Sequence, residues 1–257
     1  MESWTKDQKS LFNELNDKII ELGQQLKDRD EFLAHAVHEL RGAVHNIYFI
    51  SDYLADCWLN IIPSKQQEHV TVIKELAEHL KVLSEELLDF SLISSETREH
   101  HFNHVNLLDI VSNSIEYCKK AFSQYQDLQI QFQTNGVNKA IINGNSHKIR
   151  QVLTNLLTNA IKYGDEGLVS ISLELNDQNT VNYWQLGISD QGMSIPEDEL
   201  ESIFKPFFRS ANSRALPGYG IGLAICQKIA DNHNGLLKAV NNENKGSTFY
   251  FSIPTVV

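Results

Sequence analysis

The chain reads Asn155-Leu-Leu-Thr-Asn-Ala-Ile-Lys-Tyr163 inside a strongly amphipathic stretch, residues 146–163, which predicts a helix. Asn155, Asn159 and Lys162 are spaced by four and three residues, so they share one face of that helix. The apolar residues that point toward the core instead are Leu156, Leu157 and Ile161. Amide oxygens beside an ammonium group suit a magnesium ion and a phosphate chain, but a solvated polar helix face has the same pattern.

Two more segments of the second half have unusual polar or aromatic composition. The segment Asp190-Gln-Gly-Met-Ser-Ile195 directly follows a predicted strand. A buried Asp190 can accept a hydrogen bond from an exocyclic amine, and Gly192 lets a ring approach the backbone. A strand-ending turn uses the same residues and is the commoner explanation for such a motif alone. The segment Phe204-Lys-Pro-Phe-Phe-Arg209 is aromatic and basic, which is more typical of a core than of a site.

A glycine-rich segment, Gly218-Tyr-Gly220-Ile-Gly222-Leu223, opens a predicted helix. Alternating glycines expose backbone N–H groups and lead to the positive end of a helix dipole, an arrangement that suits a polyphosphate. A glycine string alone is weak evidence. The strand and short βαβ unit that a dinucleotide-binding Rossmann loop requires are missing here, so NAD binding is disfavoured.

Helix and strand patterns alternate through the second half, which predicts an α/β sandwich with helices stacked on one mixed sheet. Helices are expected at 107–125, 146–163 and 221–232, and strands at 129–133, 140–143, 168–175, 183–189, 236–240 and 248–253. The polar, histidine-rich residues 96–106 are predicted to be a linker.

The first hundred residues have a different pattern. Apolar or small residues recur at alternating steps of three and four from Leu15 to Leu54, and a second such seam runs from Ile73 to Phe90. The stretch Leu59–Ser64 between them contains Pro63, which disfavours continued helix. Two helices with a short connection form an antiparallel hairpin, and two hairpins close a dimeric four-helix bundle. For the heptads alone, a purely structural coiled coil is the favoured interpretation.

Composition excludes several classes of protein. The 257 residues contain 22 basic and 33 acidic side chains, a net charge of −11, which argues against a general nucleic-acid binder. The three cysteines, Cys57, Cys118 and Cys226, form neither a zinc pattern nor a disulfide framework. No apolar run reaches the roughly 20 residues that a membrane span needs, and the first residues are too polar for a secretion signal. The sequence therefore predicts a cytoplasmic protein without a membrane span.

The motifs of the two halves belong together. Residues 155–163, 190–195, 204–208 and 218–223 occur in the order of the sequence boxes of sensor histidine kinases, and Gly246-Ser-Thr-Phe249 is similar to the last of these boxes. The segment from Phe32 to Arg41, FLAHAVHELR, resembles the phosphoacceptor box of the same family. The chain thus resembles a sensor histidine kinase over residues 30–255, including the Bergerat-type ATP-binding fold that this family shares with gyrase.

The resemblance implies a multidomain α+β protein. Residues 1–30 would form a coiled-coil signalling helix, residues 31–96 the dimerisation and histidine phosphotransfer hairpin, and residues 105–257 the catalytic ATP-binding domain. His38 would attack the γ-phosphate of ATP, and Glu39 would be its general base or hydrogen-bond partner. His35 and His45 lie on the same broad side of the helix, but only His38 is followed by Glu-Leu-Arg.

The resemblance also implies the ATP and Mg²⁺ site. Asn159 would coordinate magnesium, Asp190 would recognise the adenine amine, and Tyr163 would pack against the nucleotide. Arg209 would meet the γ-phosphate. The other residues expected to bind the nucleotide are Asn155, Lys162, Gly192, Ile195, Gly218, Gly220, Gly222 and Leu223.

The implied partners are a second copy of the chain, the receiver domain of a response regulator and an upstream sensor or input protein. Two other functions remain open on the residues: a degenerate kinase that acts as a phosphotransfer or docking scaffold, and a hydrolytic ATPase of the same fold. The chain departs from the family at Gly42-Ala43, where a polar residue and proline are usual. Ser194 replaces a usual glycine, and Asn145 replaces a usual acidic residue.

Overall fold

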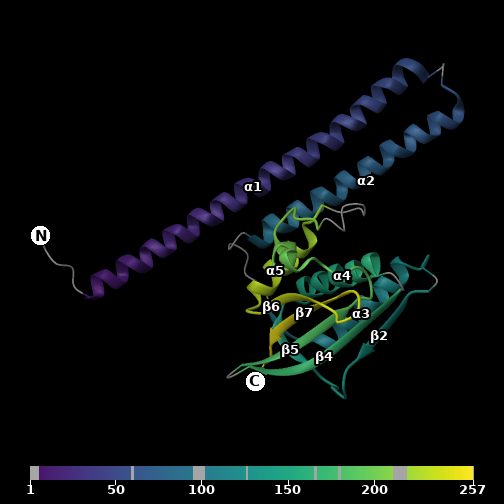
Figure 1. Ribbon diagram of the computed structural model, residues 1–257. Helices are drawn as coiled ribbons and strands as arrows, with labels where there is room; N and C mark the ends of the chain where they lie inside the picture. Colours follow the sequence, from purple (N-terminus) through teal and green to yellow (C-terminus); the bar gives the residue numbers. More distant parts are fainter. Residues whose placement is uncertain are drawn as a thin grey trace, which may run out of the picture. The chain divides into compact units, whose positions relative to one another are not determined.

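The computed structural model describes residues 6–58, 61–94, 102–125, 127–164, 167–178, 181–210 and 219–256. The chain divides into two compact units, Met1–Glu85 and Glu86–Val257 (Figure 1). Among the described residues, no helix has a stretch that is both long enough and apolar enough to cross a membrane.

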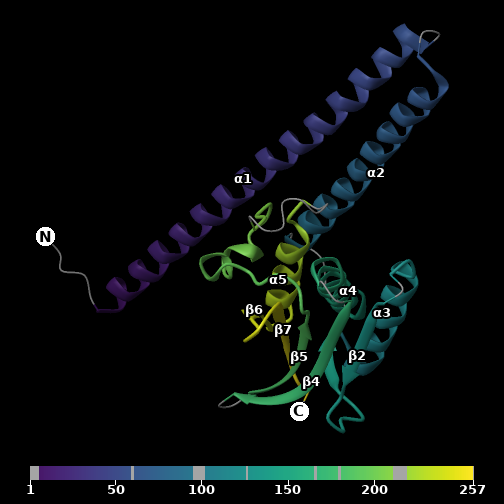
Figure 2. The ribbon, with the colours of Figure 1, turned by 45° about the vertical axis from the view of Figure 1, so that its right-hand side comes forward.

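The first unit is a helical hairpin. Helix α1 spans Lys6–Cys57, and helix α2 begins at Pro63 and extends to Ser94. Within the unit the two helices run antiparallel and side by side (Figures 1 and 2). Proline is well suited to the first position of α2, because the N–H that it lacks would have no partner in the helix. The two predicted apolar seams therefore form two helices, as expected.

Side chains of both helices fix the connection between them. The Gln66 side-chain amide donates to the carbonyl oxygens of Trp58, at 2.5 Å, and of Ile61, at 3.1 Å. The rings of Tyr53 and His69 lie 5.6 Å apart, one on each helix. These contacts hold the end of α1 against the beginning of α2.

The second unit is a two-layer α/β structure. Its main sheet is mixed: β2 is parallel to β4, and the other neighbouring pairs are antiparallel. In spatial order the strands are β2 (Gln129–Gln133), β4 (Leu168–Gln178), β5 (Val181–Ser189), β7 (Ser247–Pro254) and β6 (Leu236–Asn241). The expected mixed sheet is confirmed.

Three helices cover one face of this sheet (Figures 1 and 2). They are α3 (Leu107–Ala121), α4 (Ser146–Tyr163) and α5 (Gly222–Asn232). Along β4 the buried side chains Val169, Ile171 and Leu173 alternate with half-buried serines, as expected of a strand with one face in the core. Two short 3₁₀ helices, η2 (Glu197–Glu199) and η3 (Ser202–Phe204), follow the end of β5.

The prediction of a linker over residues 96–106 is wrong at its end. Residues 103–106 form β1 (Asn103–Asn106), which pairs antiparallel with β3 (Ile141–Gly144). The side-chain oxygen of Asn106 then accepts from the N–H groups of Leu108 and Ala140, so it both caps α3 and ties β1 to the next segment. The strand depends on a partner far along the chain, and its own polar composition gives no strand signal.

All three cysteines are free thiols. Cys57 is half-buried, whereas Cys118 on α3 and Cys226 on α5 are fully buried. Burial raises the pKa of Cys118 to about 11 and that of Cys226 to about 12, because a thiolate loses its hydration there. Both groups therefore stay protonated in the folded chain at neutral pH.

We expect a water-soluble disulfide reagent at pH 8 to modify Cys57 and to leave Cys118 and Cys226 unmodified until denaturant is added. The free energy of unfolding should also fall as the pH rises above 9, because the two buried thiols ionise near that pH only in the unfolded chain. Thiol titration and denaturant unfolding at pH 8 and pH 10 measure both effects. Rapid native labelling of three thiols would contradict the assignment.

Candidate functional site

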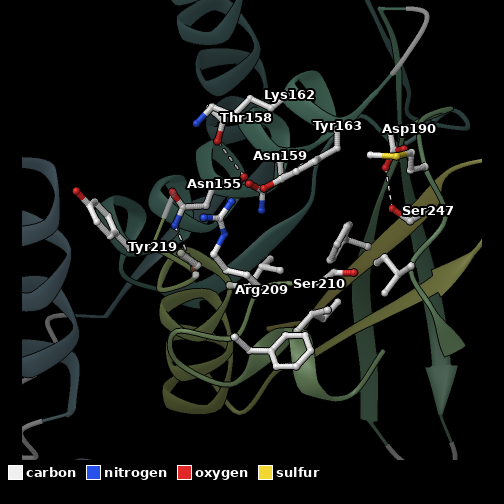
Figure 3. A pocket seen from close by; sticks show the side chains of 18 of the residues that line it. Asn155, Thr158, Asn159, Lys162, Tyr163, Asp190, Arg209, Ser210, Tyr219 and Ser247 are labelled. Carbon is white, nitrogen blue, oxygen red and sulfur yellow. Dashed lines mark hydrogen bonds between the residues drawn. The ribbon is translucent and has the colours of Figure 1, made fainter. Parts of the chain in front are cut away.

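A cavity of about 250 Å³ opens beside α4, the end of β5 and the beginning of α5 (Figure 3). It brings together segments of the chain that the sequence analysis singled out separately. The predicted site residues that line it are Asn155, Asn159, Lys162, Tyr163, Asp190, Ile195, Arg209, Gly220, Gly222 and Leu223.

Helix α4 supplies one wall of this pocket. Its first turn is capped by Asn145, whose side-chain oxygen accepts from the N–H groups of His147 and Lys148 at 3.0 and 3.2 Å. An amide oxygen caps a helix as well as a carboxylate does, so the loss of the acidic residue usual in the family leaves the helix start intact. The apolar face of α4 is buried in the core, which directs Asn159 and Lys162 to the pocket.

The glycine-rich segment meets α4 at Asn155. The Asn155 amide nitrogen donates to the carbonyl oxygen of Gly222, 3.3 Å away, and Thr158 donates to the carbonyl oxygen of Asn155 at 3.0 Å (Figure 3). A Cβ added at Gly222 would lie 3.6 Å from Asn155, an ordinary contact. Packing within the chain therefore does not require glycine at this position, whereas a ligand that approaches the backbone at the start of α5 does benefit from it.

The carboxylate of Asp190 lies at the other end of the pocket and is only 2% exposed. Its Oδ1 accepts from the backbone N–H of Gly192 at 2.8 Å. Its Oδ2 accepts from the hydroxyl of Ser247, also at 2.8 Å (Figure 3). Each carboxylate oxygen retains a second lone pair, so Asp190 can still accept a hydrogen bond from a ligand amine.

Two glycines allow close packing around this pocket. A Cβ at Gly192 would overlap the carbonyl oxygen of Tyr163 at the end of α4, so the loop after β5 can lie against the helix only with glycine there. Gly220 has a positive φ of 73°, and its carbonyl oxygen accepts from the N–H of Phe207. Gly192 is buried and does not line the cavity itself.

The remaining predicted site residues lie elsewhere. Gly218 lies outside the described residues. His38 and Glu39 are exposed on α1, in the other unit of the chain. Sequence reasoning did not assign a role to Ser247, although the motif Gly246-Ser-Thr-Phe249 contained it. It also gave no role to several other lining residues, among them Thr158, Met193, Phe208, Tyr219 and Phe249.

The residues that line the pocket fit a magnesium ion whose ligands are mainly phosphate oxygens of the nucleotide. In the described part of the chain, no three His, Cys, Asp or Glu side chains gather closely enough to hold a metal ion. Magnesium binds through few protein ligands when it also binds nucleotide phosphates, and an amide oxygen is a suitable ligand. Asn159 lines the pocket with such an oxygen.

The fold and this pocket define a nucleotide-binding ATPase domain. Residues 144–257 match the family described as histidine kinase-, DNA gyrase B- and HSP90-like ATPase. The catalytic domain of histidine kinase ThkA is 31% identical, with a TM-score of 0.51 that covers 60% of this chain and 97% of that domain.

The similarity extends beyond the ATPase domain. The autoinducer 2 sensor kinase/phosphatase LuxQ of Vibrio cholerae is 29% identical over 236 residues, which is 91% of this chain. The structure of ThkA in complex with the response regulator protein TrrA is 25% identical, has a TM-score of 0.68 and covers 91% of this chain and 64% of that one. The chain therefore carries an ATPase domain of the histidine kinase type and is similar to sensor histidine kinases over most of its length. It spans 27% of the length of LuxQ and 33% of the length of a second curated relative.

Replacing Ser247 by alanine should weaken nucleotide binding. The Ser247→Ala variant leaves Oδ2 of the buried Asp190 without its donor, which we expect to cost about 1–3 kcal/mol of stability unless a ligand or water replaces the hydroxyl. Thermal unfolding and nucleotide titration measure the two effects. Ser252→Ala is the matched control, since Ser252 is a buried serine of the same strand that contacts Gln185 and not the pocket. Equal nucleotide affinity in both variants would contradict the role of Ser247.

Proposed function

We propose that the chain is an ATP-dependent histidine autokinase that passes a phosphoryl group from His38 to an aspartate in the receiver domain of a response regulator. The observation that carries the proposal is the pocket, which places a buried carboxylate at one end and the polar face of α4 at the other. The complex of ThkA with a response regulator supports the same class of partner for this chain.

The two ends of the pocket suit the two ends of ATP. Asp190 accepts a hydrogen bond from the adenine amine, while Tyr163 and Ile195 pack against the base. At the other end Asn155, Lys162 and Arg209 neutralise and orient the phosphates. The backbone N–H groups of the segment Gly218–Leu223, with Gly220 and Gly222, lie at the start of α5, where the helix dipole favours negative charge. Asn159 holds Mg²⁺, which supplies neutralisation of the phosphate oxygens.

The transfer itself requires a nucleophile. His38 is exposed on α1, and a histidine ring nitrogen can act as the nucleophile of a covalent intermediate. A ring nitrogen of His38 forms a bond to the γ-phosphorus while the bond from that phosphorus to the bridging oxygen breaks and ADP leaves. Glu39 accepts or stabilises the imidazole proton. In a second step the N–P bond breaks as an aspartate oxygen of the receiver domain takes the phosphoryl group.

His38→Gln should abolish incorporation of label from γ-labelled ATP, whereas His35→Gln and His45→Gln should retain it. The label should be acid-labile and alkali-stable, as a phosphohistidine is. Asn159→Ala should remove the magnesium-dependent part of the reaction. The measurement is autophosphorylation of the full chain with ATP and magnesium.

The same assay separates the alternatives. Label that persists in His38→Gln assigns the nucleophile to another residue. Steady release of phosphate without a phosphohistidine indicates a hydrolytic ATPase of this fold. Nucleotide binding without either reaction indicates a degenerate kinase that acts as a docking or phosphotransfer scaffold.

We further propose that the helical hairpin dimerises and closes a four-helix bundle. Exposed apolar side chains follow one side of α1 at steps of four, seven and four residues, and each is half exposed or more: Leu33, Val37, Val44 and Tyr48. An apolar stripe on a long helix is stable in water only when another helix covers it. A second hairpin supplies that cover.

The dimer predicts a mass of twice 29.2 kDa in solution. The double variant Val37→Glu, Val44→Glu places charges in the stripe and should shift the chain toward the monomer at micromolar concentration. Light scattering after size exclusion measures this change. Ser51→Glu is the control, because Ser51 is an exposed polar position of the same helix. A monomeric unsubstituted chain would rule out the bundle.

We assign one role to each of the three segments that the sequence analysis predicted. Residues 1–30 receive a signal from an upstream sensor or input protein, residues 31–96 dimerise and carry His38, and residues 105–257 bind ATP. The free thiols of the three cysteines agree with the reducing cytoplasm as the proposed location.

A further inference from the structure

The loop that follows β5 is held at both ends by two consecutive asparagines: Asn241, the last residue of β6, and Asn242, which follows it in the turn to β7. At its start, the side-chain amide of Asn242 donates to the carbonyl oxygen of Asp190 at 2.8 Å and to the hydroxyl of Ser189 at 3.1 Å. The amide oxygen of Asn242 accepts from the hydroxyl of Thr248 at 2.6 Å. Both the nitrogen and the oxygen of the Asn242 side-chain amide are thus hydrogen-bonded, and this side chain holds the backbone of Asp190 in place.

At the other end of the loop, Asn241 pairs with both backbone groups of Ile195. Its Oδ1 accepts from the Ile195 N–H at 2.8 Å, and its Nδ2 donates to the Ile195 carbonyl oxygen at 2.7 Å. The two bonds form a closed ring between one side chain and one residue, which fixes both position and orientation. Ile195 lines the pocket, and Asn241 does not.

A third contact joins the middle of the loop to the same turn. The hydroxyl of Ser194 lies 3.4 Å from the carbonyl oxygen of Gly246. Gly246 has a positive φ of 87°, and a Cβ there would overlap the carbonyl oxygen of Asp190, so the turn lies directly on the loop. Ser194 replaces the glycine that is usual in the family. Its hydroxyl therefore adds a hydrogen bond between the loop and the turn that a glycine cannot make.

We propose that Asn241 is a positioning residue for nucleotide binding: its paired hydrogen bonds to Ile195 hold the loop Asp190–Ile195 in the shape that receives the base. This proposal rests on the proposed nucleotide site. The Asn241 side chain pairs with Ile195 and does not line the pocket, so its effect falls on the end of the pocket that contains Asp190 and Ser247. The phosphate end, with Asn155 and Arg209, lies apart from it (Figure 3).

Binding of ATP and of ADP to the full chain tests the proposal. The measurement is displacement of a fluorescent trinitrophenyl derivative of ATP. Asn241→Ala should raise the Kd of ATP and of ADP by the same factor, about tenfold or more, since two hydrogen bonds to the loop are lost and the phosphate contacts are kept. Asn241→Asp keeps the acceptor for the Ile195 N–H and loses the donor, so its Kd should lie between those of the alanine variant and the unsubstituted chain.

Asn182→Ala is the matched control, because Asn182 is an exposed asparagine of the same sheet outside the pocket. Thermal unfolding of both Asn241 variants and of this control in the absence of nucleotide should show that each is folded at the temperature of the binding assay. Unchanged nucleotide affinity in Asn241→Ala, or in Asn241→Asp if the alanine variant does not fold, overturns the role of Asn241 and leaves the proposed function standing. Affinity that falls only in step with the unfolding temperature also overturns it. Absence of binding by the unsubstituted chain overturns the proposed function as well.

Discussion

The carboxylate of Asp190, buried at the end of β5, joins two parts of the second unit that are far apart in the chain. Water is largely excluded from Asp190 there, so its carboxyl oxygens need donors held at hydrogen-bond distance. One donor is the N–H of Gly192, two residues on, and the other is the hydroxyl of Ser247, 57 residues away at the start of β7. Because β5 and β7 are neighbours in a fixed register, the start of β7 brings the Ser247 hydroxyl to the carboxylate at the end of β5.

Helix α4 couples this carboxylate to the rest of the pocket. Its apolar face packs in the core, so its polar face is fixed relative to the sheet. The carbonyl oxygen of Tyr163, the last residue of α4, lies so close to Gly192 that any side chain at that position would overlap it. At its other end, the N–H of Asn145 donates to Nε2 of the buried His233, whose Nδ1 lies 2.7 Å from the carbonyl oxygen of Ile229 in α5. The two helices that line the pocket are therefore tied together through a neutral imidazole.

Sequence patterns predicted the parts of this protein that depend on local periodicity. The seams over Leu15–Leu54 and Ile73–Phe90 gave α1 and α2, and the amphipathic stretch 146–163 gave α4 at its observed bounds. The polar strand β1 was missed because its pairing with β3, rather than its composition, makes it a strand. Asn241 gave no signal of a role, and Ser247 gave none beyond its place in the motif Gly246-Ser-Thr-Phe249. A serine or an asparagine near a turn is ordinary, and only its distant partner gives it significance.

The sequence by itself determined where the motifs lie: their order, the face shared by Asn155, Asn159 and Lys162, and the position of the aspartate after a strand were all readable from spacing. Spacing works for these residues because a helix repeats every 3.6 residues and a strand every two, whatever surrounds them. Only the tertiary structure decided how the motifs meet, which loop is held to which turn, and which hydroxyl satisfies Asp190. Those choices depend on hydrogen bonds between residues far apart in the chain, which form only after the core has placed the sheet and the helices together.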